Sequence, residues 1–90
     1  MSEPIHPGLL WRQLIQTSGM TQRELAERMG ISAKILNRIC NGKHRPRPCY
    51  TVIFAEVMNA NLDDLWAAQC AWELEQARVV AERWLANERD

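Results

Sequence analysis

The chain has 90 residues, enough for one small domain built around a single core. Hydrophobic residues make up 47% of it, whereas Phe and Tyr occur once each and Gly and Pro four times each, which favours a compact helical fold over a turn-rich β fold. No stretch resembles a signal peptide or approaches the length of a membrane span, so we expect a cytoplasmic protein with no membrane partner.

The formal net charge is zero, but the charge is divided between the two halves of the chain. Residues 1–50 contain eight Lys or Arg and three acidic residues, a balance of +5, while residues 51–90 contain three Arg and eight acidic residues, a balance of −5. We expect the basic half to face phosphate groups and the acidic half to face away or toward a partner. On charge alone, two solvated faces of opposite sign are the simpler alternative.

The first helix is expected to begin near Pro7, after a short polar tail, because proline suits the first turn and apolar residues then recur at helical spacing until Gly19. Thr21 predicts the N-cap of a short second helix, with Glu24 completing a capping box. Gly30 is expected to end that helix.

Ser32 predicts the N-cap of a third helix, which should run to Asn41 and stop at Gly42. Residues 43–48 include two prolines and are expected to form an extended, basic loop rather than a helix. A fourth helix should follow, and the residues expected on or near its apolar side are Val52, Ile53, Ala55, Val57 and Met58.

Asn61 predicts the N-cap of a fifth helix, with two aspartates well placed in its first turn. No helix breaker follows, so a helix over residues 62–88 would be about 40 Å long at ~1.5 Å per residue. Its apolar side chains form one stripe and an adjoining one. The first contains Trp66, Cys70, Leu74, Ala77, Ala81 and Trp84, and the second contains Leu65, Ala68 and Trp72.

Residues 22–41, QRELAERMGISAKILNRICN, carry the strongest functional pattern. Two short helices are joined at Gly30, and the small Ala26 permits a close crossing. The residues expected to pack these helices together are Leu25, Met29, Ile31, Leu36 and Ile39.

Over about residues 9–66 the pattern resembles the helix-turn-helix of the Xre and lambdoid phage repressor family, with T-Q-x-E-L-A at 21–26 and N-G-K at 41–43. That resemblance implies an all-α, five-helix repressor-like domain with an extended C-terminal helix. We therefore expect one DNA-binding domain over residues 1–90, with a core at about 7–66 and an extension at 67–90.

Within that family the chain is similar to the HigA-type antitoxins. The opening His6-Pro7-Gly8 matches their H-P-G, N-L-D-D-L at 61–65 looks like the family's fifth-helix start, and W-A-A-Q at 66–69 echoes their W-L-x-L-Q. The chain departs from the HigA pattern at Leu9, where glutamate is usual, and at Leu62, where proline is usual.

Family geometry implies that the third helix enters the major groove of DNA. Lys34 and Arg38 can donate to guanine, Asn37 can pair with adenine, and Ala33 can contact a thymine methyl group. The alternative is an ordinary solvated helix face. The expected base-contacting residues are Ser32, Ala33, Lys34, Asn37, Arg38 and Asn41.

A second set of residues is expected to hold the DNA backbone, because phosphate contacts set register without reading sequence. Gln22 matches the family position that clamps a phosphate, and the proline-bearing loop supplies cations. A generic basic loop is the alternative. The expected phosphate-contacting residues are Thr21, Gln22, Lys43, His44, Arg45 and Arg47.

The three cysteines indicate reduced thiols rather than a disulfide framework. A metal site around His44 and its neighbouring cysteines is not expected, because no C-x-x-C pair is present. No cofactor is expected, and the only histidines, His6 and His44, sit in no catalytic constellation, so an enzyme is disfavoured. The resemblance further implies that Cys40 and Ile15 replace an ion pair found in several phage repressors, which makes Cys40 structural.

Beyond about residue 72 the last helix has nothing in its own chain left to cover. An exposed apolar patch usually marks an interface, and a reader of operator half-sites generally needs a two-fold partner. Homodimerisation is therefore the leading use of this patch, binding of a small basic toxin of the ribonuclease class is the rival, and folding back onto the first helix is the simplest alternative. The expected interface residues are Leu74, Ala77, Val80, Ala81, Trp84 and Leu85.

The function these patterns favour is sequence-specific repression from a palindromic double-stranded DNA operator, by a HigA-type antitoxin that autoregulates its operon and neutralises a toxin. A stand-alone Xre-type regulator is the alternative. A protein-interaction adaptor that has lost DNA binding is a third hypothesis, against which the basic first half of the chain argues.

Overall fold

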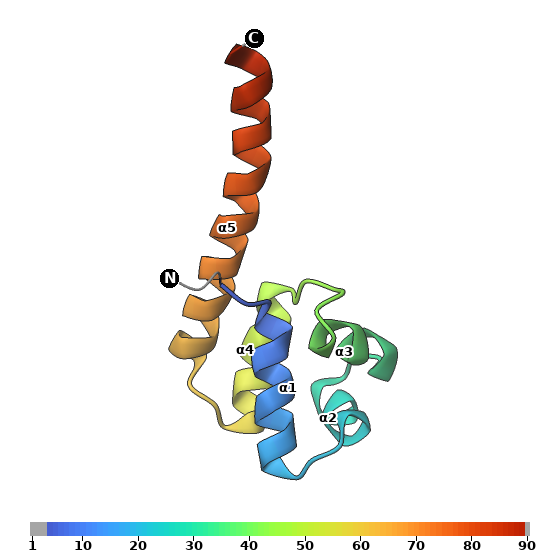
Figure 1. Ribbon diagram of the computed structural model, residues 1–90. Helices are drawn as coiled ribbons and strands as arrows, with labels where there is room; N and C mark the ends of the chain where they lie inside the picture. The colour runs from blue at the N-terminus through green and yellow to red at the C-terminus, as the bar shows by residue number, and fades with distance from the viewer. Residues whose placement is uncertain (1–3, 90) are drawn as a thin grey trace.

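A computed structural model describes residues 4–89, which form five helices and, within that range, no strand. The first four helices and the start of the fifth pack into one body, from which the fifth rises as a free arm (Figure 1). The expected all-α, five-helix order is confirmed. The helices are α1 (Pro7–Ser18), α2 (Gln22–Met29), α3 (Ala33–Cys40), α4 (Pro48–Met58) and α5 (Leu62–Arg89).

The predicted starts of α2, α3 and α5 are confirmed by side-chain caps, which satisfy backbone N–H groups that have no partner within the helix. The Thr21 hydroxyl accepts from the backbone N–H of Glu24 at 3.1 Å and lies 3.2 Å from the Glu24 carboxylate, to which it donates. Ser32 caps α3, and the side-chain oxygen of Asn61 accepts from the N–H of Asp64 at 3.0 Å. These elements therefore begin where short-range chemistry places them.

Two helix boundaries differ from the expectation. The third helix ends at Cys40, with Asn41 as its C-cap rather than its last residue. The fourth begins at Pro48, which the sequence placed in the loop. Proline is accommodated there because the first helical position needs no N–H donor and proline presets the required φ angle.

The core is centred on Trp11 of α1 and Phe54 of α4, whose rings stack with centroids 4.2 Å apart. The expected apolar side of α4 was partly wrong, since Val52 is 51% exposed while Thr51 and Phe54 are fully buried. The helix turns residues 51, 54 and 55 inward, and the polar character of Thr51 concealed that register. The expected packing of α2 on α3 is confirmed, because Leu25, Ala26, Met29, Leu36 and Ile39 are buried and Ile31 is packed against them.

The segment His6-Pro7-Gly8 joins three parts of the body. The Nδ1 atom of His6 accepts from the backbone N–H of Gly8 at 2.9 Å and so caps α1, and the His6 ring meets the ring of Trp72 on α5 edge-on at 4.7 Å. Gly8 lies directly against the carbonyl group of Ile39 in α3. The H-P-G opening thus has a packing role that brings together α1, α3 and α5.

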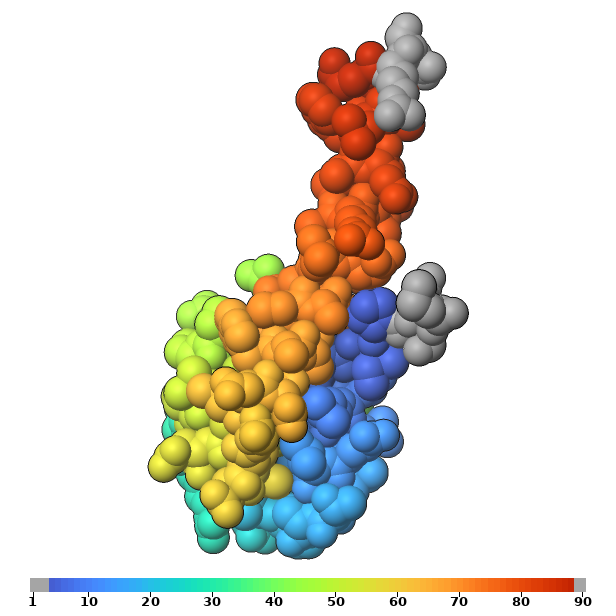
Figure 2. Space-filling view, turned by 90° about the vertical axis from the view of Figure 1, so that its left-hand side faces the viewer, coloured from blue at the N-terminus to red at the C-terminus, as the bar shows by residue number. Residues whose placement is uncertain are grey.

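The fifth helix packs on the body through its first turns, as far as Trp72 against His6 and Glu73 beside Arg45. Leu65 and Gln69 face the core, whereas Trp66 is 40% exposed. The apolar stripe that begins at Leu65 therefore covers the body, and the stripe that begins at Trp66 faces away from it. Figure 2 shows the distal half of α5 standing clear of the body, and the molecule measures 52 × 25 × 20 Å. Folding back onto α1 is therefore wrong for residues 74–85, which are exposed apart from half-buried Glu75. No helix among residues 4–89 is both long and apolar enough to span a membrane.

Candidate nucleic-acid interface

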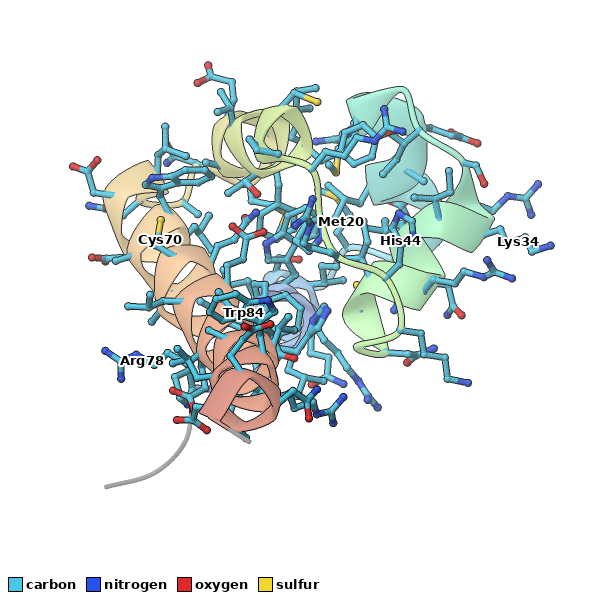
Figure 3. The ribbon with its side chains drawn as sticks, turned by 90° about the horizontal axis from the view of Figure 1, so that it is seen from above. Met20, Lys34, His44, Cys70, Arg78 and Trp84 are labelled. Carbon is cyan, nitrogen blue, oxygen red and sulfur yellow. The ribbon has the colours of Figure 1, made fainter. Side chains whose placement is uncertain are left out.

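The outward face of α3 is defined by which of its side chains are buried. Leu36, Ile39 and Cys40 point into the core and are fully buried. The strongly amphipathic helix therefore turns its polar side to solvent, and Figure 3 shows Lys34 projecting on the side away from α5. All six candidate base-contacting residues are exposed: Ser32, Ala33, Lys34, Asn37, Arg38 and Asn41.

Four of these residues share one open hollow with the first cation of the following loop. Lys34, Asn37, Arg38 and Asn41 line it together with Lys43. Two positive side chains and two amides are thus held on one surface, where the cations can donate to guanine O6 and N7 and the amides can both donate and accept. The loop cation adjoins them because the backbone N–H of Lys43 donates to the carbonyl of Arg38 at 2.9 Å.

The amides on this surface are linked in a chain that crosses from α2 to α3. The side-chain Nδ2 of Asn37 donates to Oε1 of Gln22 at 3.3 Å, and Nδ2 of Asn41 donates to Oδ1 of Asn37 at 3.1 Å. The chain fixes the orientation of the Asn37 amide before any ligand arrives. Because Oε1 of Gln22 accepts from Asn37, the Nε2 group of Gln22 is left to donate elsewhere, and such a donor suits a phosphate oxygen.

Ser32 and Thr21, the two candidate contact residues with hydroxyl groups, use those groups to cap helices. The Ser32 oxygen accepts from the N–H groups of Lys34 and Ile35 at 3.1 and 3.3 Å, and Thr21 is engaged with Glu24. Ser32 can therefore offer DNA only its O–H donor. Ala33, the first residue of α3, presents a methyl group at the exposed end of the helix.

The basic loop follows directly on α3. Lys43, His44, Arg45 and Arg47 are all exposed, whereas Pro46 between them is buried. Of the Lys and Arg side chains in this loop, Arg45 differs because its Nη1 atom lies 3.3 Å from the carboxylate of Glu73 on α5. The structure thus brings Lys43 to the edge of the α3 surface and ties Arg45 to the acidic helix.

Sequence reasoning missed two residues of α5 that contact this loop. Gln69 donates to the carbonyl of Pro46 at 3.0 Å, and Glu73 pairs with Arg45. The available signal for Gln69 was the W-A-A-Q echo, which indicated family likeness without a role. Nothing in the sequence distinguished Glu73 from the other acidic residues of α5, so its contact with the loop could not be predicted.

Cys40 is fully buried, in the same core as Ile15. Burial raises the pKa of its thiol to about 11, although the nearby Arg12 guanidinium acts to lower it. The thiol is consequently protonated at neutral pH and contributes by packing. Cys49 and Cys70 are exposed free thiols.

The distal half of α5 presents a continuous apolar face. Leu74, Val80 and Trp84 are 56%, 67% and 61% exposed. Leu74, Ala77, Ala81 and Trp84 are spaced by three, four and three residues, which places them on one side of the helix with Leu85 and Val80 flanking them. All six expected interface residues therefore lie on uncovered surface.

Comparisons with known proteins agree with the fold described above. A family model described as helix-turn-helix matches residues 12–65, which run from α1 to the first turn of α5. The HTH-type transcriptional regulators for conjugative elements SXT of Vibrio cholerae and pMERPH of Shewanella putrefaciens are each 43% identical to this chain over 47 residues. That match covers 52% of this chain and 21% of each relative, so the chain spans about a fifth of their length.

Solved structures share the whole arrangement. PA4674 from Pseudomonas aeruginosa was solved with its 28 bp operator DNA. It matches this chain with a TM-score of 0.79 at 18% identity, and the match covers 96% of each chain. An addiction module antidote protein of the HigA family from Coxiella burnetii has a TM-score of 0.74 at 22% identity, covering 97% of this chain and 96% of its own. Likeness at these identities shows a common fold, and its extent includes most of α5.

Proposed function

This chain belongs to the Xre-type helix-turn-helix family of DNA-binding transcription regulators, and we propose that it is a sequence-specific repressor of the HigA antitoxin type. The observation that carries the proposal is the shared surface of Lys34, Asn37, Arg38, Asn41 and Lys43 on and beside α3. In this proposal the protein acts in the cytoplasm as a homodimer on a palindromic operator.

Base recognition is assigned to the outward face of α3, laid in the major groove. Lys34 and Arg38 donate to guanine, while Asn37, oriented by Gln22, presents its amide to adenine. Ser32 donates its hydroxyl hydrogen, Ala33 contacts a thymine methyl group, and Asn41 acts directly and through Asn37. PA4674 supports the assignment, because a protein with the same fold was solved with operator DNA.

Phosphate contact is assigned to the residues that border this face on two sides. Gln22, which is bonded to Asn37, and Thr21 lie at the amino end of α2, whereas Lys43, His44 and Arg47 lie on the loop that follows α3. Arg45 joins them when its bond to Glu73 opens. Contacts of this kind set affinity and register and make binding strongly dependent on salt.

Homodimerisation is assigned to the apolar face of distal α5, comprising Leu74, Ala77, Val80, Ala81, Trp84 and Leu85. The small alanines allow two helices to approach closely, while the larger side chains fill the contact on either side. Two copies related by a two-fold axis would present two α3 helices to two operator half-sites, which are read one helical turn apart.

Toxin neutralisation is assigned to the acidic side of the same helix, where Glu75 and Glu82 lie away from the apolar face. The H-P-G opening, the length of α5 and the shared fold of the HigA-family antidote protein support this assignment. A stand-alone regulator is the second candidate, and it is favoured by the relatives that regulate conjugative elements.

Two experiments test these assignments. Selection of binding sites from randomised duplex DNA should yield a palindrome whose half-sites are about 10 base pairs apart, centre to centre. Failure to enrich any sequence would favour the adaptor hypothesis. Co-expression with the product of the adjacent open reading frame should rescue growth if that product is a toxin. A harmless neighbouring protein would favour the stand-alone regulator.

A further inference from the structure

Gln69 is a fully buried polar side chain on α5, remote in sequence from the DNA-binding face. Its Oε1 atom accepts a hydrogen bond of 2.6 Å from the hydroxyl of Thr51 on α4, and its Nε2 group donates at 3.0 Å to the carbonyl of Pro46 in the basic loop. One amide therefore fastens both the loop and the first turn of the helix that follows it.

The chemistry of this contact requires an amide. Pro46 contributes a buried carbonyl that accepts from Gln69. Thr51 contributes a hydroxyl that donates to Gln69 at 2.6 Å and also lies 3.5 Å from the Arg47 carbonyl, a much longer contact. An apolar side chain would leave both groups without this partner, and a carboxylate would face the Pro46 carbonyl with no hydrogen to donate. Only a side chain with a donor and an acceptor at one end satisfies both.

The contact holds the loop near its carboxyl end, at Pro46, which lies between Lys43 and Arg47 in the chain. At one end, the backbone N–H of Lys43 donates to the Arg38 carbonyl at the close of α3. At the other, Arg47 is the N-cap residue of α4, and its carbonyl accepts from the N–H of Thr51 at 3.2 Å. With Pro46 bound to Gln69, both Lys43 and Arg47 therefore extend from a fixed backbone.

We propose that Gln69 is a positioning residue for DNA binding, which presets the basic loop so that Lys43 and Arg47 meet the phosphate backbone together with α3. The proposal rests on the proposed phosphate role of the loop. Its physical basis is preorganisation, because a loop that is not already ordered must lose conformational entropy to reach the phosphates, and a contact is lost where that entropy cost exceeds what the contact contributes. It also assigns the start of α5 a part in DNA affinity without any DNA contact of its own.

The test replaces Gln69 with leucine and, as a milder second variant, with methionine, and measures affinity for selected operator DNA across a salt series. Each phosphate contact contributes about 0.9 to the slope of log affinity against log salt concentration. We expect Gln69→Leu and Gln69→Met to weaken binding about tenfold and to reduce that slope by about one unit. The preference for operator over unrelated DNA measured at each salt concentration should fall far less than the affinity.

A matched control separates positioning from a general loss of stability. Leu65 lies one turn earlier on the same face of α5 and is buried without a hydrogen bond to the loop. Leu65→Ala should lower the melting temperature at least as much as Gln69→Leu while leaving the salt slope unchanged. An equal slope change in Leu65→Ala, or an unchanged slope in both Gln69 variants, would overturn the proposal.

Epistasis distinguishes failure of this proposal from failure of the phosphate role itself. In a chain carrying Lys43→Ala and Arg47→Ala, Gln69→Leu should cause no further change in slope, because the cations it positions are gone. A further reduction in that background would overturn the positioning role. If Lys43→Ala with Arg47→Ala leaves the slope of the otherwise native protein unchanged, the phosphate role falls, and the positioning role falls with it.

Discussion

The carbonyl oxygen of Ile39 lies so close to Gly8 that a Cβ atom at Gly8 would be 1.6 Å from it. The start of α1 thereby rests on the last turn of α3, the helix that carries the candidate base contacts. Gly8→Ala should force these helices apart and destabilise the protein by about 1–3 kcal/mol or more, as overpacking does. Urea unfolding measures the loss.

The control for this prediction is Gln13→Ala at an exposed position of the same helix, which should change stability by no more than about 0.5 kcal/mol. A Gly8→Ala protein as stable as this control would mean that α1 is free to shift on α3.

His6 should make stability depend on pH. Burial lowers its pKa from the ordinary value of 6.5, and its Nδ1 must be unprotonated to accept from the N–H of Gly8. The folded chain thus binds fewer protons at this site than the unfolded chain, so the stability contribution is present above about pH 6.5 and is lost as pH falls through the folded pKa.

His6→Asn keeps a capping oxygen without this titration. Unfolding free energies of both proteins at pH 7.5 and 5.5 provide the measurement, and native His6 should show the larger decrease. Equal decreases would contradict the role of His6 in pH dependence.

Arg38→Ala should weaken operator binding by about 1–3 kcal/mol and relax base choice at one position in each half-site. The reason is its exposed place on α3, beside Lys34 and Asn37. Binding to operator and to unrelated DNA should be compared at one salt concentration. An equal loss on both would make Arg38 a phosphate contact instead.

Glu73→Gln should release Arg45 from its 3.3 Å ion pair and make it available to phosphate. The expected result is a salt slope steeper by up to about one unit, since an exposed pair contributes little stability of its own. In the native protein, Arg45→Ala should accordingly reduce the slope less than Arg47→Ala. If Glu73→Gln leaves the slope unchanged, Arg45 either reaches DNA despite Glu73 or never reaches it.

Trp84→Glu together with Leu74→Glu should place charge on the apolar face of distal α5 and yield a folded monomer with weak operator affinity. Sedimentation measures the oligomeric state, and circular dichroism checks that the chain remains helical. Val79→Glu is the matched control, because Val79 is exposed on another side of the helix. A double variant that still sediments as a dimer would place the interface elsewhere.

Much of the fold was predictable because its signals are local. Thr21, Ser32 and Asn61 each cap a helix through groups two or three residues away, and Gly30 ends α2 with a left-handed φ of 72°. The outward face of α3 follows from helical periodicity, because Leu36, Ile39 and Cys40 recur on one side of the helix. Val52 was misplaced because α4 has apolar residues around most of its circumference, so periodicity could not select its buried side.

The sequence by itself determined the five helices, the capped starts of α2, α3 and α5, and which side chains of α3 face solvent, since each depends on neighbours within about one turn. Tertiary structure alone decided which stripe of α5 covers the body, that Gln69 is buried between Thr51 and Pro46, and that Arg45 is paired with Glu73. The partners of Gln69 lie 18 and 23 residues away. Contacts over such separations depend on how the helices cross, and a buried glutamine has the same local signature as one on the surface.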